Sequence, residues 1–187
     1  MDWETVTEQL KAPLDPKAIK PPPQGKFGEY VDGLHVIREA NRIFGFNGWS
    51  YVVTRLEMVS RVESAGNGNV RVGYLCAVRA TVDGVVREGT AVGNGAAKPD
   101  NEADAHESAV KEAETDALKR ALRSFGNTFG LALYDKDKSA REVGTPFDAG
   151  ENRDRMLAAI NKQTNPDELD GLWKHKAFTA TFAKLPE

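Results

Sequence analysis

The segment from Glu112 to Asp137, EAETDALKRALRSFGNTFGLALYDKD, constrains the fold of this chain more than any other part of it. It carries apolar residues at the i, i+4, i+7, i+11 spacing of a buried helix face, namely Leu118, Leu122, Phe125 and Phe129. Three cations fall within an arc of roughly 100° on another side of the same helix, namely Lys119, Arg120 and Arg123. The segment therefore predicts a helix that packs on one side and presents clustered positive charge on another.

This clustered charge has two explanations. In the first, it is a solvated face on which Asp116 pairs with Arg120 at i+4 and reaches Lys119 at i+3, and the cations complement the helix dipole. In the second, the cations contact successive phosphates of a nucleic acid strand. The chain has 25 Lys and Arg against 28 Asp and Glu, so the cations are a local feature. Spacing alone favours the solvated face.

The rest of the pattern predicts an α+β fold. Residues 50–61 and 69–82 are rich in β-branched and aromatic residues, and a third strand is expected over about 85–92. A hairpin loop and an Asp-Gly turn separate these three segments. Gly93–Ala97 is expected to break the sheet before a long helix over Asp100–Arg123. We therefore expect an antiparallel three-stranded β-meander followed by a long helix, a β-β-β-α core.

Two helices are expected before this core. Residues 2–12 suit a short helix, and a proline-rich connector follows it. Asp32 is a candidate N-cap for a second helix over 34–44, which Gly45 would end. The apolar face of this second helix would hold Ile37, Ala40 and Phe44.

A turn with two aromatic neighbours follows the second helix. Asn47-Gly48 is a strong turn signal, and Phe46 and Trp49 flank it. Aromatic side chains at a turn either stack on a nucleobase or anchor the core. Core anchoring is the commoner of the two outcomes.

The C-terminal quarter is expected to form a separate small element. Residues 144–152 have the composition of a linker between a main domain over 1–143 and a helical element over 153–187. Two short helices, over 153–162 and 167–176, would make a C-terminal helical hairpin. Trp173 and Phe178 are candidates to anchor this hairpin.

Carboxylates near the cations allow one enzymatic hypothesis. The acidic residues of this region are Glu107, Glu112, Asp116, Asp135 and Asp137. A metal-dependent DNA-processing enzyme needs carboxylates that converge on one or two Mg²⁺ ions, and the i, i+4 pair Glu112 and Asp116 could converge. Carboxylates on a helix are more often solvated, so we expect no metal and no catalytic residue.

Other cofactor chemistry has no support in the sequence. His35, His106 and His175 are scattered, and the single cysteine, Cys76, lies in an apolar run typical of a buried strand. No phosphate-binding loop of the GxxxxGK[ST] type occurs, so ATP hydrolysis by that route is not expected. No apolar run approaches the roughly 20 residues of a membrane span. The N-terminus lacks the apolar stretch of a secretory signal, so a cytoplasmic location is expected.

Three blocks of the chain resemble the DNA-annealing domain of the Rad52 family. They are Tyr30–Trp49, Cys76–Gly93 and Lys111–Asp137, and the resemblance runs from about residue 24 to 140. It implies a β-β-β-α core that assembles into a homo-oligomeric ring with single-stranded DNA in a basic groove. Residues 1–143 would then be a non-enzymatic domain that anneals complementary strands in recombination and repair without ATP.

The resemblance also assigns candidate site residues. Lys119, Arg120 and Arg123 fall on the family's groove cations, which reverses the preference for a solvated face. His35 falls at a further groove arginine and Phe46 at a groove tyrosine. A histidine that is mostly neutral near pH 7 would contribute less charge there. Asp100 falls at a lysine of an outer DNA site, so that site is not expected here.

Two alternative functions stay open. The alternatives are the metal-dependent DNA-processing enzyme and an oligomeric adaptor that does not bind DNA. Beyond DNA and further copies of the chain, the partners implied are a single-strand-binding protein or a recombinase, which the C-terminal hairpin could contact. In a bacterium or phage the protein would be associated with the nucleoid.

Overall fold

The computed structural model describes residues 1–22, 28–135, 143–144, 149–162, 170–171, 173–174, 179 and 181–183. The chain divides into two compact units, Met1–Gly144 and Thr145–Glu187. Across the described residues, no helix is both long enough and apolar enough to cross a membrane.

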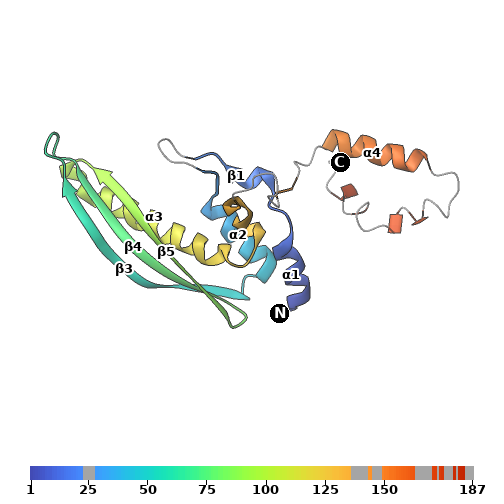
Figure 1. Ribbon diagram of the computed structural model, residues 1–187, viewed down its shortest axis with the longest axis horizontal. Helices are drawn as coiled ribbons and strands as arrows, with labels where there is room; N and C mark the ends of the chain where they lie inside the picture. The colour runs from blue at the N-terminus through green and yellow to red at the C-terminus, as the bar shows by residue number, and fades with distance from the viewer. Residues whose placement is uncertain are drawn as a thin grey trace. The chain divides into compact units, whose positions relative to one another are not determined.

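A three-stranded antiparallel sheet forms the centre of the first unit. Its strands are β3 (Trp49–Glu63), β4 (Val70–Val82) and β5 (Val85–Ala97), and they lie in the order β3-β4-β5. Asp83 and Gly84 both have positive φ, 47° and 82°, as expected of the turn type that suits the twist of a two-residue hairpin. The predicted β-meander is confirmed (Figure 1).

The long helix α3 (Glu102–Arg123) packs along β4 and β5, which confirms the predicted β-β-β-α core (Figure 1). It faces the sheet with alanines that are fully buried, namely Ala105, Ala109, Ala113, Ala117 and Ala121. Leu118, Leu122 and Phe129 of the predicted apolar stripe are also buried, and Phe125 is half-buried. Small side chains therefore hold most of the helix close to the sheet, and the larger ones fill the space near its C-terminal end.

The prediction that Gly93–Ala97 breaks the sheet is wrong. These residues continue β5, with Gly93 opposite Tyr74 and Ala97 opposite Val70. A Cβ on Gly93 would lie 2.2 Å from the carbonyl oxygen of Ala109, and one on Gly95 would lie 1.8 Å from that of Ala105. Glycine is required here because the backbone of α3 lies directly on the strand.

The elements before the sheet gather at the C-terminal end of α3 (Figure 1). They are α1 (Trp3–Lys11), the 3₁₀ turn η1 (Pro16–Ala18), the paired short strands β1 (Ile19–Lys20) and β2 (Tyr30–Val31), and α2 (Gly33–Phe44). The side chain of Asp2 accepts from the amide of Glu4 and caps α1. The side chain of Asp32 accepts from the amide of His35 at 2.7 Å and caps α2, as predicted.

The predicted buried face of α2 is wrong at one position. Ala40 and Phe44 are buried, but Ile37 is 39 % exposed. The buried stripe begins instead at Val36 and continues through Ala40 to Ile43 and Phe44. Ile37 lies about 100° around the helix from Val36, at the edge of the buried stripe, where it lines a small hollow with Thr115 and Leu118 of α3.

The chain after α3 turns back on itself through two 3₁₀ turns. These are η3 (Asn127–Phe129) and η4 (Leu131–Tyr134), and Gly130 between them has φ of 90°. In the second unit, α4 spans Ala149–Asn161, where the sequence predicts a helix over 153–162. The ring of Trp173 contacts the ring of Phe182 edge to face at 5.0 Å. Phe178 and His175 lie outside the described residues.

Candidate nucleic-acid interface

A hollow of about 380 Å³ lies at the C-terminal end of α3. Three parts of the chain line it: the last turns of α3, the segment that enters β2, and the turns η3 and η4. The lining residues are Gly28, Glu29, Tyr30, Val31, Glu112, Asp116, Lys119, Arg120, Arg123, Phe129, Gly130, Leu133 and Tyr134. The structure thus brings the three predicted cations together around one hollow, together with two tyrosines that the sequence analysis does not single out.

Lys119 is held by two neighbours. Its Nζ donates to Oδ1 of Asp116 at 2.7 Å and lies 5.3 Å from the centre of the Tyr30 ring. Its side chain is 21 % exposed. Asp116 therefore pairs with the i+3 partner, and the expected i+4 pair with Arg120 is absent from the described part of the chain. Part of the charge of Lys119 is balanced within the protein.

Arg120 and Arg123 are less constrained by acidic groups. The side chain of Arg120 is exposed and makes no hydrogen bond or ion pair with any residue that the structure describes. The guanidinium carbon of Arg123 lies 3.8 Å from the centre of the Tyr134 ring, which is a close cation–π contact. These two arginines therefore supply most of the positive charge that is available to a ligand in the hollow.

Three carboxylates of the predicted acidic set have partners within the protein. Oε2 of Glu112 accepts from the amide of Asn94 at 2.7 Å, and Asp116 pairs with Lys119. Glu107 pairs with Lys111, whose hydrogen bond lowers the pKa of the Glu107 carboxyl. Within the described ranges, no three His, Cys, Asp or Glu residues lie close enough together to hold a metal ion. Asp137 lies outside the described residues.

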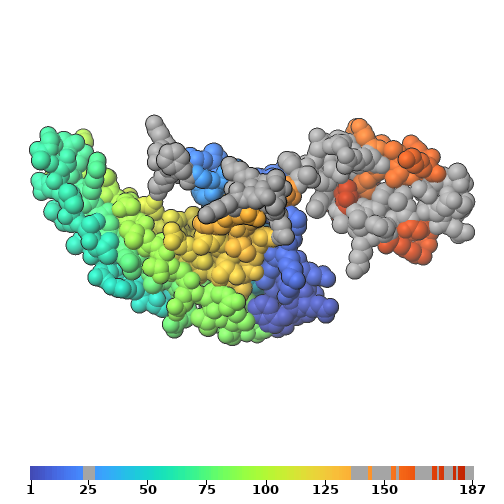
Figure 2. Space-filling model, viewed as in Figure 1, coloured from blue at the N-terminus to red at the C-terminus, as the bar shows by residue number. Residues whose placement is uncertain are grey.

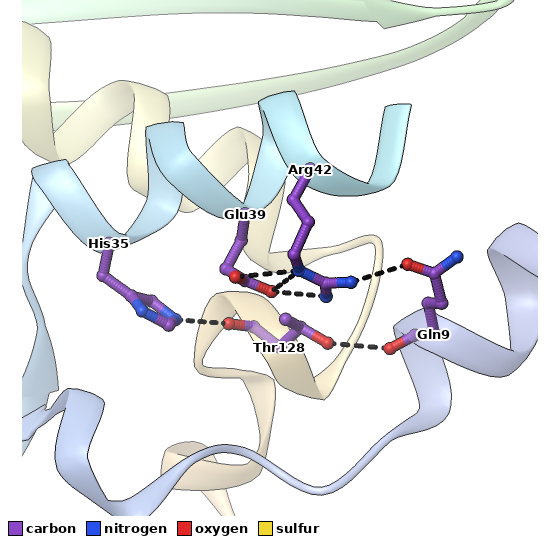
Figure 3. A network of polar contacts seen from close by, with 5 residues as sticks. All are labelled: Gln9, His35, Glu39, Arg42 and Thr128. Atoms are coloured by element: carbon purple, nitrogen blue, oxygen red, sulfur yellow. Dashed lines mark hydrogen bonds and ion pairs between the residues drawn. The ribbon is translucent and has the colours of Figure 1, made fainter. Parts of the chain in front are cut away.

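His35 lies beside the hollow and does not line it. Its Nε2 donates to the carbonyl oxygen of Thr128 at 2.9 Å, and the hydroxyl of Thr128 donates to the carbonyl oxygen of Gln9 at 2.9 Å (Figure 3). Arg42 links the side chains of Gln9 and Glu39 (Figure 3). This network connects α1, α2 and η3, so it fixes the turn that directly follows the cations of α3.

Phe46 also lies outside the hollow, but it is 87 % exposed. The core-anchoring interpretation of Phe46 is therefore wrong. Trp49 behaves differently: it is half-buried, its Nε1 donates to Oδ1 of Asn41 at 2.9 Å, and its ring stacks on Tyr51. Only Phe46 of the two offers a free aromatic face at this turn.

A second polar cluster lies at the opposite end of α3. Arg61 of β3 makes two hydrogen bonds to Glu102, at 2.6 and 2.9 Å, and His106 and Tyr74 extend the network. The hydrogen bond from Arg61, followed by that from His106, lowers the pKa of Glu102 to about 2. Asp100 is exposed in the turn η2 (Pro99–Asn101) beside this cluster. Glu102 and Arg123 lie at opposite ends of the 22-residue helix α3, about 30 Å apart along its axis.

Cys76 is fully buried in β4, as the sequence predicts. Burial raises the pKa of its thiol above the ordinary value. The thiol therefore stays protonated and belongs to the core of the sheet.

Fold and hollow together define an α+β domain of the β-β-β-α type with cations clustered at the end of its long helix. The family model of the Rad52/22 family double-strand break repair proteins matches residues 2–147. The chain therefore belongs to the Rad52/22 family, as the sequence resemblance predicts, and the match extends to both sides of residues 24–140.

Curated relatives agree with this assignment. The chain is 37 % identical over 164 residues to the DNA repair and recombination protein radC of Emericella nidulans, covering 83 % of this chain and 28 % of the relative. It is 40 % identical over 149 residues to rad22 of Schizosaccharomyces pombe, covering 76 % and 31 %. It is 42 % identical over 123 residues to RAD52 of Saccharomyces cerevisiae, covering 64 % and 25 %. The chain thus matches less than a third of the length of each of these relatives.

Proposed function

We propose that this chain binds single-stranded DNA at the cationic hollow and anneals complementary strands during homologous recombination and DNA repair, independently of ATP. The observation that supports it most directly is the convergence of Lys119, Arg120 and Arg123 on one hollow in a chain of net charge -3. Membership of a family of double-strand break repair proteins supports the same proposal.

The proposed contacts are to the phosphate backbone. Arg120 and Arg123 hold phosphates directly, and Lys119 joins them when a phosphate replaces Asp116 as its partner. Phosphate contacts carry no base information, so binding is largely independent of sequence and weakens steeply with salt. His35 acts through the turn η3 that it fixes, and Phe46 offers a stacking face at the turn after α2.

We further propose that copies of the chain assemble into a ring through β3. Every residue of this 15-residue edge strand after Trp49 is exposed, and α3 covers β4 and β5 instead. In the space-filling view β3 forms an uncovered border of the first unit (Figure 2). Apolar side chains lie on both of its faces: Val53, Leu56 and Met58 on the α3 side, and Val52 and Val62 on the other. Stable proteins cover an exposed apolar edge strand of this kind, and we propose that a second copy of the chain covers β3.

The proposal also includes a protein partner of the C-terminal element. The C-terminal helical element over 153–187 is proposed to contact a single-strand-binding protein or a recombinase. The chain then acts in the compartment that holds its DNA, which for a bacterial or phage source is the cytoplasm and its nucleoid.

A strand-annealing assay tests the proposal and separates it from the alternatives. The full chain is mixed with two complementary labelled oligonucleotides in EDTA without ATP, and we expect accelerated duplex formation. Cleavage of the DNA on addition of Mg²⁺ would support the metal-dependent enzyme instead. Absence of any gel shift with the single strand would support the adaptor and overturn the proposal.

A further inference from the structure

The contact between Arg123 and Tyr134 joins the last residues of two different elements. Arg123 ends α3, and Tyr134 ends η4, after the chain has reversed at Gly130. The chain packs closely at this reversal, because a Cβ on Gly130 would lie 3.0 Å from Cγ2 of Val31. A side chain at Gly130 would also be strained by the positive φ. It returns the Tyr134 ring to 3.8 Å from the guanidinium carbon of Arg123.

Stacking on a ring and pairing with a carboxylate differ in whether the N–H donors of a cation remain available to a ligand. A guanidinium that lies over a ring uses its flat face, and its five N–H donors remain at its edge for a planar fork to an anion. An ion pair uses the donors themselves, as Lys119 does with Asp116. No ion pair to Arg123 occurs within the part of the chain that the structure describes. Tyr134 therefore orients Arg123 and leaves its donors available.

The Tyr134 ring contributes little by burial. It is 65 % exposed although one of its faces carries the guanidinium. A ring that faces solvent to this extent stabilises the fold only weakly, so a change of this side chain acts mainly on its neighbour.

We propose that Tyr134 is a positioning residue, which holds the guanidinium of Arg123 in the orientation that binds a DNA backbone phosphate. This inference rests on the proposed function. The phosphate is bound by Arg123, and the effect of Tyr134 on DNA binding passes through Arg123.

A double-mutant cycle tests the inference. The variants are Y134L, Y134F, R123A and the double variant R123A/Y134L of the full chain. Binding to a labelled oligo(dT) strand is measured by fluorescence anisotropy at several salt concentrations, and thermal unfolding shows that each variant is folded. Y134F is the matched control because phenylalanine keeps the ring and loses the hydroxyl.

We expect Y134L to weaken binding by about three- to tenfold and to flatten the salt dependence, and Y134F to stay within about twofold of the unchanged chain. In the R123A background, Y134L should add nothing. If R123A weakens binding and Y134L does not, the positioning role is overturned and the proposed function stands.

Two other outcomes are equally decisive. An equal loss from Y134L in both backgrounds would mean that Tyr134 contacts DNA independently of Arg123, which also overturns the inference. Binding by R123A that equals that of the unchanged chain would remove Arg123 from the DNA site, and the proposed function at this hollow would fail together with the inference.

Discussion

The three cations of α3 have three different surroundings although they occupy five consecutive positions. Lys119 is paired with Asp116, Arg120 is exposed to solvent, and Arg123 is stacked on Tyr134. A phosphate that approaches the hollow meets the arginines first, because it must displace a carboxylate to reach Lys119. Asp116 thus limits the positive charge of the hollow.

Replacing Asp116 with asparagine should strengthen binding to single-stranded DNA. The substitution removes a negative charge 2.7 Å from the lysine and frees the ammonium for a phosphate. We expect the salt dependence of affinity to steepen by about 0.7 in log–log slope, the contribution of one more single-strand phosphate contact. Anisotropy titrations with oligo(dT) at several salt concentrations measure this slope.

E107Q is the matched control for D116N. Glu107 also pairs with a lysine of α3, Lys111, but neither residue lines the hollow. E107Q should therefore change the slope much less than D116N. An unchanged or smaller slope for a folded D116N would contradict the exchange of Asp116 for phosphate.

At the scale of secondary structure, the contact between α3 and β5 decides the shape of the core. Glycine on the strand meets alanine on the helix at three levels, at Gly89, Gly93 and Gly95. The helix backbone, and not flexible side-chain ends, is what an added Cβ would meet. Because packed interiors accommodate extra volume poorly, a larger residue at any of these glycines would destabilise the contact.

Replacing Gly93 with alanine should therefore destabilise the protein. The new Cβ would lie 2.2 Å from the Ala109 oxygen and 2.3 Å from the Ala113 nitrogen. We expect a loss of about 1–3 kcal/mol in the free energy of unfolding, as for other overpacked cores. Urea unfolding followed by circular dichroism measures it. G66A is the control, since nothing lies within 4 Å of a Cβ there. Equal stability of the two variants would contradict the close packing.

The cluster at the other end of α3 predicts a pH dependence. Glu102 has a folded-state pKa of about 2, below its ordinary value of 4.5, because Arg61 and His106 bind the carboxylate. A lowered folded-state pKa contributes stability above pH 4.5, and that contribution is lost as the pH falls towards 2.

E102Q should therefore unfold at a lower temperature than the unchanged chain at neutral pH, and the difference should shrink below about pH 4.5. Thermal unfolding over a pH series measures it, with E4Q as the control because Glu4 is exposed in α1. A difference that stays constant down to the lowest pH at which the chain folds would show that the charge of Glu102 is not responsible.

In the whole molecule, the edge strand β3 stays uncovered when only a single copy of the chain is present. Its apolar side chains alternate between two faces, and both faces are exposed. A strand of this kind in a lone subunit would pair or aggregate with another chain. The proposed assembly of copies would cover this strand and would place several cationic hollows along one DNA strand.

Replacing Leu56 with glutamate should weaken assembly. Leu56 lies on the α3 side of β3 and is 48 % exposed, so the change adds charge where a second copy is proposed to pack. We expect smaller particles by sedimentation velocity, with slower strand annealing. L157E in α4 is the matched control, because Leu157 has a similar exposure of 50 %. An unchanged particle size for L56E would rule out this face as the interface.

The positions of the three cations follow from the local sequence pattern, but the residues that contact each cation do not. The helical period placed Lys119, Arg120 and Arg123 on one side of α3, and the structure keeps them there. Tyr30 and Tyr134 have no such signal, because helical periodicity ends with the helix and they approach the cations through separate segments. Whether Asp116 pairs at i+3 or i+4 likewise depends on rotamers that sequence spacing leaves open.

The amino-acid sequence is enough to predict the order of strands and helix, the turn at Asp83-Gly84, the cap at Asp32 and the family. These are properties of short stretches, in which backbone preferences and side-chain periods act between near neighbours. Tertiary structure alone decided that Gly93–Ala97 stays a strand, that Phe46 faces solvent and that Tyr134 returns to Arg123. Each of these depends on which distant backbone lies alongside, and the path of the folded chain sets that distance.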